Sequence, residues 1–285
     1  MRKGILLAGG TGSRLYPATI AISKQLIPVY DKPMIYYPLS TLMYAKCRNI
    51  LLISTKKDLP LYKKLLGTGK DLGLKIVYKV QPKPKGIAQA FLIGKKFLNN
   101  DKCILILGDN IFWGNEIEKL LKKNINNNGS TIFLYNVNDP SSYGVAKIKN
   151  KKVINIIEKP KKFISNKAVT GLYFFDEKVS KFASELKFSA RGEIEITDLI
   201  NKYIKKNQIN YEIIDKGNAW LDAGTHLDLL ESSMYVKTLQ KRLGLMIGSI
   251  HEIAYQNGWI KKNKLKNIIK KLGKNEYSKY LNNIL

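Results

Sequence analysis

The stretch Gly4–Pro17, GILLAGGTGSRLYP, decides how the N-terminal half of the chain folds. Its apolar residues Ile5–Ala8 have the length of a fully buried strand, and they lead directly into three glycines within Gly9–Gly12. Glycine lets the backbone turn sharply and approach a ligand closely, so the N–H groups of such a loop can converge on an anion. Arg14 adds a cation beside the loop. The sequence therefore predicts a phosphate-binding loop at the end of a strand.

The spacing of these glycines excludes two common phosphate-binding loops. No lysine follows them, whereas a Walker loop needs G-x-x-x-x-G-K-[ST]. A dinucleotide-binding motif needs G-x-G-x-x-G, but Gly10–Leu15 ends in leucine. The alternative to a phosphate loop is an ordinary glycine-rich turn between a strand and a helix.

The composition is typical of a globular protein. Of the 285 residues, 45% are hydrophobic, which is enough for a sizeable core. We expect a large domain over residues 1–240 and a helical region over residues 241–285, where the pattern is helical throughout. No apolar run approaches the ~18 residues of a membrane span, and residues 1–30 do not resemble a signal peptide. The two cysteines, Cys47 and Cys103, do not require an oxidising compartment, so we expect a cytoplasmic protein without a membrane partner.

The net charge is +27, from 49 basic and 22 acidic residues. Nucleic-acid binding, attraction of anionic substrates and a lysine-rich surface without a specific role would each account for it. The lysines are spread along the chain, and even the densest stretch, Lys261–Lys279, places apolar residues at helical spacing. No RNA-binding motif or zinc-finger spacing occurs, and we expect no nucleic-acid partner.

Strand-like and helix-like segments alternate along the first half of the chain. This alternation predicts an α/β fold with a mostly parallel sheet flanked by helices. The expected strands are Ile5–Ala8, Ile50–Ser54, Leu74–Val80, Ile104–Leu107 and Thr131–Val137, and the expected helices are Met34–Lys46, Ile87–Leu98 and Ile117–Asn124.

In the second half of the chain, the sequence predicts a hairpin, a further strand and a helix start. Val145–Ile148 and Val153–Glu158 are expected to form a hairpin, and Val169–Phe175 a further strand. Thr225 is placed to begin a helix, with Asp228 three residues later as in a capping box.

Charged residues follow several of these strands, at the edge where ligands bind in such sheets. Asp109 follows an apolar strand and Asp222 precedes a helix start, so a converging pair would suit Mg²⁺, which prefers oxygen ligands. Each aspartate alone is equally typical of a cap or a turn. Lys24, Lys159 and Arg191 also lie in contexts typical of ligand binding, although any one of them alone is more typical of a solvated surface charge.

Three longer stretches are more specific than the glycine loop: Ser23–Met43, Ser189–Asp198 and Trp220–His226. With further matches over Tyr78–Phe91, Leu107–Gly114, Tyr135–Val145 and Ala168–Asp176, the chain resembles the glucose-1-phosphate thymidylyltransferases, a family of sugar nucleotidyltransferases. The resemblance covers essentially the whole chain and implies a Rossmann-like core with a sugar-binding subregion and a C-terminal helical region.

The resemblance also implies an activity. dTTP and α-D-glucose 1-phosphate would give dTDP-glucose and pyrophosphate by Mg²⁺-dependent in-line displacement, in the first step of dTDP-L-rhamnose biosynthesis. Catalysis would consist of positioning and charge stabilisation, without a covalent intermediate. His226 and His251 are too few and too poorly placed for a proton relay, so we expect both to be structural.

The resemblance assigns site residues by motif. Arg14, Lys24, Lys159 and Arg191 would be catalytic, and Asp109 and Asp222 would hold Mg²⁺. The nucleotide would contact Gly9, Gly10, Thr11, Gly12, Ser13, Gln25, Gln81, Pro84, Gly86 and Asp109, with Gln81 and Gly86 at the thymine. The sugar phosphate would contact Asn110, Tyr143, Gly144, Glu158, Lys159, Val169, Gly171, Arg191 and Trp220.

Members of the family are homotetramers inhibited by dTDP-rhamnose at a second site between subunits, and the same is expected here. The chain departs from the family pattern at Lys85, beside Gly86, and at Ala223, after Asp222. One alternative is the same fold acting on another nucleotide or sugar phosphate, such as UTP or galactose 1-phosphate. Another is a non-catalytic sensor of sugar nucleotides, although the basic and acidic residues of the expected site are all present.

Overall fold

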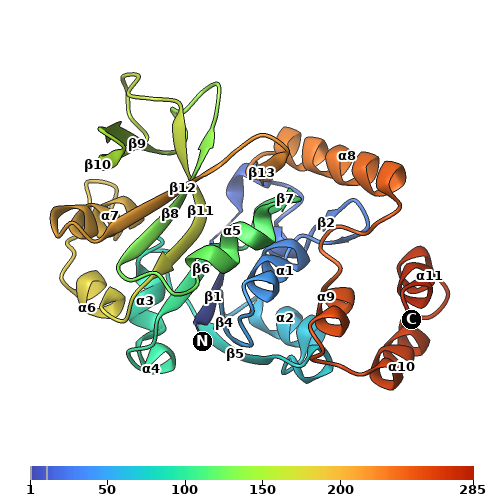
Figure 1. Ribbon diagram of the computed structural model, residues 1–285. Helices are drawn as coiled ribbons and strands as arrows, with labels where there is room; N and C mark the ends of the chain where they lie inside the picture. Colours follow the sequence, from blue (N-terminus) through green and yellow to red (C-terminus); the bar gives the residue numbers. More distant parts are fainter. Residues whose placement is uncertain (1, 11) are drawn as a thin grey trace.

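A computed structural model describes residues 2–10 and 12–285, and it is organised around one twisted sheet (Figure 1). The described residues form a nine-stranded sheet in which β10-β9-β11-β6-β1-β4-β5 are consecutive neighbours, with β8 and β12 joined to it through β11. The predicted α/β class with a mostly parallel core is confirmed. Thr11, expected in the phosphate loop, lies outside the described residues.

Four parallel strands form the N-terminal half of this sheet. They are β1 (Lys3–Ala8), β4 (Asn49–Ser54), β5 (Lys75–Val80) and β6 (Cys103–Leu107). Nearly every side chain of β1, β4 and β6 is buried, as expected for parallel strands covered on both faces. The carboxyl ends of β1 and β6 are neighbours, since Leu7 pairs with Leu107, so the residues that follow both strands meet at one edge.

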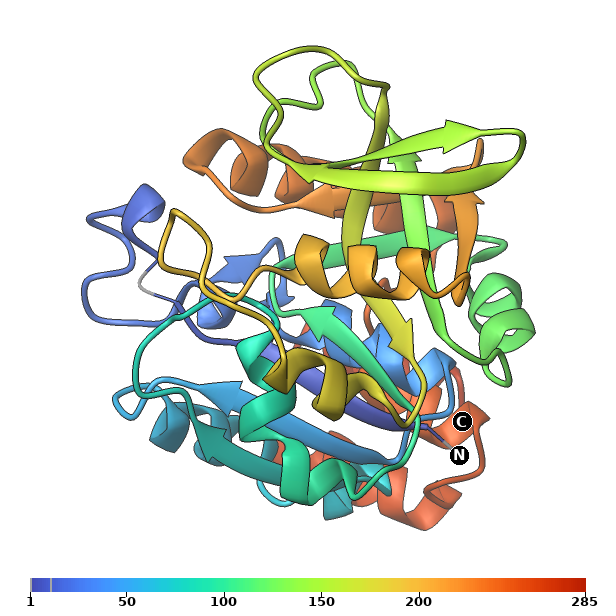
Figure 2. The same ribbon diagram turned by 90° about the vertical axis from the view of Figure 1, so that its left-hand side faces the viewer.

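The other half of the sheet is mainly antiparallel. Strand β11 (Lys167–Phe175) runs against β6 and against β8 (Ser130–Asn136), and β12 (Ile209–Ile214) runs parallel to β8. The predicted hairpin is confirmed as β9 (Gly144–Lys149) and β10 (Lys152–Glu158), which projects above the main sheet in Figure 2. Two small sheets pair β2 (Pro28–Val29) with β3 (Lys32–Pro33) and β7 (Asn110–Gly114) with β13 (Asn218–Asp222).

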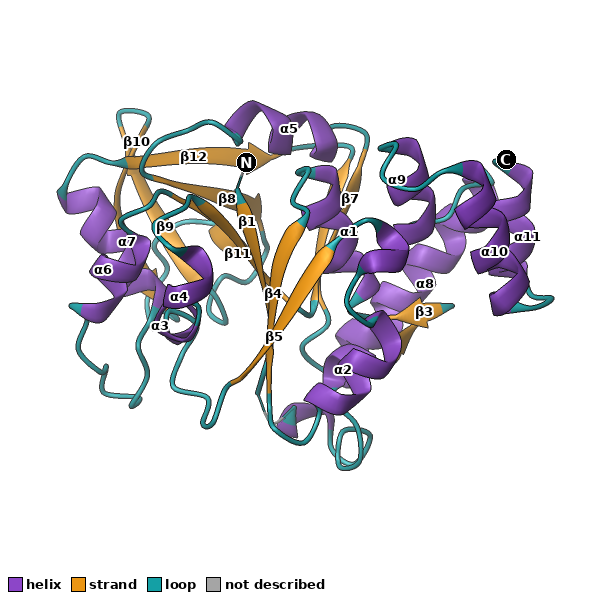
Figure 3. Ribbon diagram, turned by 90° about the horizontal axis from the view of Figure 1, so that it is seen from below, coloured by secondary structure: helices purple, strands orange, loops and turns teal. Residues whose placement is uncertain are grey.

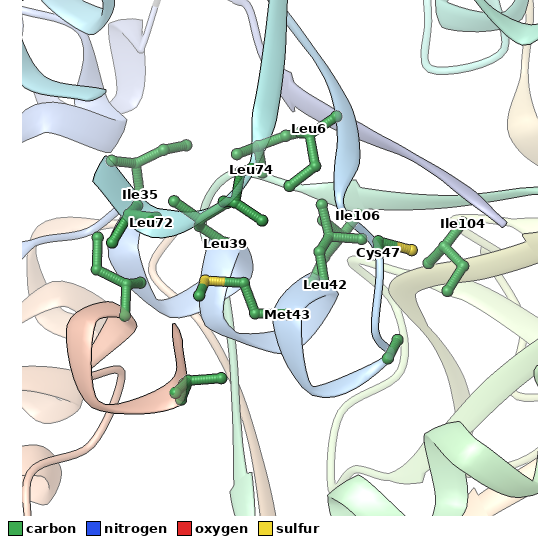
Figure 4. Close-up of a cluster of buried hydrophobic side chains, with 14 of the residues drawn as sticks. Leu6, Ile35, Leu39, Leu42, Met43, Cys47, Leu72, Leu74, Ile104 and Ile106 are labelled. Atoms are coloured by element: carbon green, nitrogen blue, oxygen red, sulfur yellow. The ribbon is translucent and has the colours of Figure 1, made fainter. Parts of the chain in front are cut away.

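Helices cover both faces of the sheet (Figure 3). One face packs against α1 (Tyr36–Tyr44), α2 (Leu59–Leu66) and α5 (Ile117–Asn124), and Figure 4 shows part of that core, where Leu39 and Leu42 of α1 meet Leu6 of β1. The other face packs against α3 (Gln89–Ile93), α4 (Lys95–Leu98), α6 (Val179–Ser184) and α7 (Ile196–Lys205). Burying apolar side chains on both faces is the main stabilising term for such a sheet.

The C-terminal part is helical, as predicted. It consists of α8 (His226–Leu243), α9 (Ile250–Gln256), α10 (Lys262–Leu272) and α11 (Glu276–Asn283). Thr225 caps α8 in a capping box with Asp228, which confirms that prediction. Within the described residues, no helix combines the length and apolarity that crossing a membrane requires.

Two helix predictions needed correction. The helix expected over Met34–Lys46 is shorter, spanning Tyr36–Tyr44. The helix expected over Ile87–Leu98 is two short helices that break at Gly94, where a Cβ would lie 2.9 Å from the Ala90 carbonyl oxygen and 3.1 Å from a Leu51 methyl group. This close approach to the sheet explains why the position is a glycine.

Candidate functional site

The loop after β1 forms the first part of the site. Gly10 and Gly12 have φ angles of +103° and +62°, which L-residues with a side chain rarely adopt. The Gly12 carbonyl is held by the Leu15 N–H at 2.9 Å and by the Thr19 hydroxyl at 2.8 Å. The loop borders a cavity of about 260 Å³, here called the phosphate cavity, which is lined by Gly9, Gly10, Gly12, Ser13, Arg14, Lys24, Gln25, Asp109 and Gly224.

Lys24 and Asp109 form an ion pair at the floor of this cavity. Lys24 lies in a 3-10 turn before β2, and Asp109 lies between β6 and β7. Burial alone would raise the pKa of Asp109, but the Lys24 ammonium and the Asn110 amide, which donates to Asp109 Oδ1 at 2.9 Å, hold it below its usual value. Asp109 is therefore a carboxylate with one oxygen on a cation and the other on an amide.

Asp222 approaches Asp109 from a distant part of the chain. It ends β13, pairs with Asn110 of β7, and the next residue, Ala223, donates its N–H to the Asp109 carbonyl at 3.3 Å. Burial and the neighbouring Asp109 charge raise the pKa of Asp222 to about 7. The Lys24 and Arg14 charges offset this shift only in part, and the oxygen donors of the Asp109 and Asp222 pair suit a divalent metal. Among the described residues no group of three or more Asp, Glu, His or Cys side chains is placed to hold a metal, so ligands beyond this pair would come from water or substrate.

A second cavity of about 210 Å³, here called the sugar cavity, lies beside the first. Arg14 and Asp109 line both cavities. All nine residues that the sequence assigned to the sugar phosphate line the sugar cavity, together with Asp222. The fold therefore brings together residues that are more than 200 positions apart along the chain and makes two chambers that share a cation and a carboxylate.

Asn110 lines the sugar cavity and connects β7 to neighbouring elements. Its Oδ1 accepts hydrogen bonds from the Gly171 N–H at 2.9 Å and from Trp220 Nε1 at 2.6 Å, while its amide holds Asp109. A Cβ at Gly171 would lie 2.5 Å from Asn110 Oδ1, so only glycine fits there. The Trp220 ring packs edge-on against Tyr143, with centroids 5.2 Å apart. Such aromatic faces suit the apolar side of a sugar ring.

Arg191 lies at the outer side of the sugar cavity among three carboxylates. Its guanidinium nitrogens lie 3.4 Å from Glu158, 3.1 Å from Glu193 and 3.4 Å from Glu195. Burial, followed by the Glu195 charge, raises the pKa of Glu158. Lys159 is held nearby by a hydrogen bond from its N–H to the Tyr143 carbonyl at 2.9 Å. Both cations are exposed or half-exposed, and an anionic ligand can reach them.

Gln81 and Gly86, expected at the thymine, and Pro84, expected at the nucleotide, line neither the phosphate cavity nor the sugar cavity. Gln81 and Pro84 line a third cavity of about 320 Å³, together with Gly10. Gly86 has a φ angle of +92° and packs against Ile194, where a Cβ would lie 2.4 Å from the carbonyl oxygen. The structure thus places Gln81 and Pro84 at a cavity and Gly86 in the loop that follows it.

Comparisons with known proteins agree with this arrangement. A family profile described as "Nucleotidyl transferase" matches residues 3–238. A glucose-1-phosphate thymidylyltransferase of Neisseria meningitidis is 48% identical over 285 residues, which covers 99% of both chains. One from Xanthomonas campestris is 51% identical over 98% of this chain and 96% of its own. The chain belongs to the glucose-1-phosphate thymidylyltransferase family. It is a nucleotidyltransferase enzyme.

Solved structures support the same fold. A Bacillus anthracis protein assigned as a glucose-1-phosphate thymidylyltransferase matches with a TM-score of 0.77 and 42% identity, covering 82% of this chain and 95% of that one. A UDP-glucose pyrophosphorylase bound to UDP-glucose matches with a TM-score of 0.74 at 24% identity, and it is informative about the fold alone. The α/β fold of the family is therefore shared by this chain.

Sequence reasoning missed several residues that line the two chambers. Ser142, Tyr173 and Thr197 line the sugar cavity, and Gly224 lines the phosphate cavity. All four stand inside stretches on which the resemblance rests, and that is the signal that could have found them. Tyr173 pairs with Leu105 of β6 in the sheet.

Proposed function

We propose that this enzyme transfers a thymidylyl group from dTTP to α-D-glucose 1-phosphate, giving dTDP-glucose and pyrophosphate. The observation that carries the proposal is the pair of adjoining cavities that share Arg14 and Asp109. The phosphate cavity has a glycine loop and two cations, as a triphosphate requires. The sugar cavity offers an aromatic wall and polar groups at its rim, as a sugar phosphate requires.

The reaction needs an attacking oxygen and a leaving group in line at the α-phosphorus. Lys159 and Arg191 would hold the sugar phosphate so that its oxygen faces the nucleotide. Arg14 and Lys24 would neutralise the charge that develops on the departing pyrophosphate. No nucleophilic side chain is used, because binding both substrates in this geometry supplies the positioning.

Mg²⁺ is the metal we propose for the Asp109 and Asp222 pair. Two half-buried carboxylates that repel each other fit a hard divalent ion that completes its shell with phosphate oxygens and water. When bound, the ion supplies charge neutralisation of the triphosphate. Lys24, which pairs with Asp109 in the free protein, would then be available to the phosphates.

The substrate assignment is tested by measuring pyrophosphate release over a grid of nucleoside triphosphates and sugar 1-phosphates. dTTP with glucose 1-phosphate is expected among the best pairs by kcat/KM. A clear preference for UTP or for galactose 1-phosphate would replace the assignment by the alternative substrate. No turnover with any pair, despite tight binding of dTDP-glucose, would favour a sugar-nucleotide sensor.

Further proposals follow from family membership. The product would feed dTDP-L-rhamnose biosynthesis, and the chain would assemble as a homotetramer inhibited by dTDP-rhamnose. Light scattering on the purified protein tests the tetramer, and inhibition of pyrophosphate release at saturating dTTP tests a second site. The cytoplasmic location and the division of the chain near residue 240, which falls inside α8, stay predictions.

A further inference from the structure

Gln89, the first residue of α3, lines neither the phosphate cavity nor the sugar cavity, yet it contacts Gln81, which lines the third cavity beside the glycine loop. Gln81 Nε2 donates a hydrogen bond to Gln89 Oε1 at 2.8 Å. We propose that Gln89 is a positioning residue that sets nucleobase specificity, because it fixes the Gln81 carboxamide with its oxygen towards the base. The inference rests on the proposed function, in which Gln81 contacts the base of the nucleotide.

A backbone N–H determines which way the carboxamide groups of Gln81 and Gln89 are turned. The Lys85 N–H donates to the same Gln89 Oε1 at 3.1 Å. A backbone N–H can only donate, so Gln89 must present its oxygen here rather than its amino group. Gln81 contacts that oxygen and must therefore present its amino group to Gln89. The Gln81 oxygen is left facing away from Gln89.

The Lys85 peptide is itself held in place. Its carbonyl accepts from the Ile194 N–H at 2.8 Å, and the Ala88 N–H donates to the Ile194 carbonyl at 3.2 Å. The Lys85 ammonium lies over the Phe188 ring, 5.3 Å from its centroid. Lys85, where the chain departs from the family pattern, thus contributes to this network through its backbone.

The Gln81 oxygen lies where a ligand can reach it. Gln81 borders the cavity of about 320 Å³ beside the glycine loop, and its own N–H is fixed by the Ser54 carbonyl at 2.7 Å. A Cβ at Gly9 would lie 2.0 Å from Gln81 Oε1, so the oxygen packs directly against the loop. In the part of the chain that the structure describes, no protein group donates to this oxygen. A ligand that enters this cavity can therefore donate to it.

A fixed acceptor distinguishes pyrimidines by the hydrogen on their ring nitrogen. Thymine and uracil carry an N3–H, which can donate to Gln81 Oε1. Cytosine has a lone pair at N3, and two acceptors facing each other lose a hydrogen bond and repel. The Gln89–Gln81 pair therefore selects bases with a ring N–H and does not distinguish thymine from uracil.

The test compares kcat/KM for dTTP, dUTP and dCTP, each with glucose 1-phosphate, in the wild type, Gln89→Met and Gln89→Glu. Gln89→Met keeps the side-chain length but removes the acceptor, so Gln81 can turn its amino group towards the cytosine N3. We expect the dTTP-to-dCTP ratio to fall about 10-fold or more, with dTTP and dUTP affected alike. Gln89→Glu still accepts from both N–H groups and is expected to keep the wild-type ratio.

Gln240→Met is the matched control. Gln240 Oε1 also accepts from one backbone N–H, that of Ile247, and one side chain, Lys32, both at 3.0 Å, but it lies outside the site. Gln240→Met is expected to lower the melting temperature without changing the dTTP-to-dCTP ratio of kcat/KM. An equal loss of kcat/KM for dTTP and dCTP in Gln89→Met would show a merely structural role and overturn the inference. A wild type that does not use dTTP with glucose 1-phosphate would instead overturn the proposed function.

Discussion

Arg14 lines both the phosphate cavity and the sugar cavity, and in the proposed reaction its guanidinium would face both substrates. We expect Arg14→Ala to lower kcat by about 100-fold, because the guanidinium stabilises charge that develops only as pyrophosphate leaves. The KM for glucose 1-phosphate should change little by comparison. Steady-state rates of pyrophosphate release measure both parameters.

Arg48→Ala is the control for this substitution. Arg48 donates to the Gly73 carbonyl at 2.9 Å and lies over the Trp259 ring, outside both cavities. Arg48→Ala removes the same charge from the protein as Arg14→Ala, and it is expected to leave turnover unchanged. A variant of Arg14 in which only the KM for the sugar phosphate rises would contradict the assigned role.

Asp109 and Asp222 should respond to neutralisation in opposite ways. Asp222→Asn removes a buried charge that Asp109 repels, so the metal-free protein should be as stable as the wild type or more so, by about 1 kcal/mol. Asp109→Asn leaves the Lys24 ammonium buried without its partner and should destabilise by a few kcal/mol. Thermal unfolding in the presence of a chelator compares the two variants.

Activity should change in the same direction for both aspartates. Each variant is expected to need at least about 10-fold more Mg²⁺ for half-maximal pyrophosphate release, since each loses a ligand oxygen charge. Titrating Mg²⁺ at fixed substrate concentrations measures this shift. Wild-type rates at limiting Mg²⁺ in either variant would refute the metal-binding role.

At the same scale, some site residues could be predicted from the sequence and others could not. Asp109 and the glycine loop follow apolar strands directly, and that position alone places them at the ligand edge of the sheet. Gln89 gives no such signal, because its part depends on where the Lys85 N–H points and on a contact with Gln81 across a loop. Local sequence patterns predict where strands end, but they do not predict which way a side-chain amide is turned in a hydrogen-bond network.

Among the elements, the pairing of β7 with β13 decides the site, because it brings Asp222 beside Asn110. Sequence patterns found the four parallel strands, β8, β11 and the hairpin, but not β12, the short β2 and β3, or this pair, whose members are about 110 residues apart and only five residues long. A short strand that pairs with a distant one has no periodicity of its own to detect. The break of the expected helix at Gly94 was hidden for a related reason, since it follows from packing on the sheet.

Asn110 ties these elements together, and its removal should cost stability. Asn110→Ala leaves the Gly171 N–H and the Trp220 indole N–H without their shared acceptor in a buried place. We expect a loss of about 2–4 kcal/mol in the free energy of unfolding. Urea denaturation measures it, and the loosened Asp109 should also lower kcat.

Asn201→Ala is a suitable comparison for this loss. Asn201 also bridges two backbone groups, the N–H and carbonyl of Ile156, but it ties α7 to β10 away from the phosphate cavity. It should reduce stability while kcat stays near the wild-type value. Equal kcat losses in the two variants would mean that Asn110 acts only through the stability of the fold.

At the scale of the whole molecule, the C-terminal helices are part of the main core. Leu265, Ile268 and Leu281 belong to the same buried cluster as Leu6 of β1, although the family profile ends at residue 238. His251 of α9 borders a cavity together with Tyr36 and Leu72 of the N-terminal part, and its Nδ1 lies 2.9 Å from the Tyr277 hydroxyl of α11. A change in the protonation of His251 should therefore affect the unfolding of the whole chain.

Burial lowers the pKa of His251 to about 4, against an ordinary value of 6.5. Between these two values the unfolded chain binds a proton that the folded chain does not, so this residue makes the protein less stable as the pH falls from about 6.5 to 4. The loss should reach about 3 kcal/mol over that window. His251→Gln is expected to flatten this part of the stability profile, measured as melting temperature against pH, whereas His226→Gln, at an exposed contact with the Tyr16 carbonyl, should not. An unchanged slope in His251→Gln would show that other groups cause the acid sensitivity.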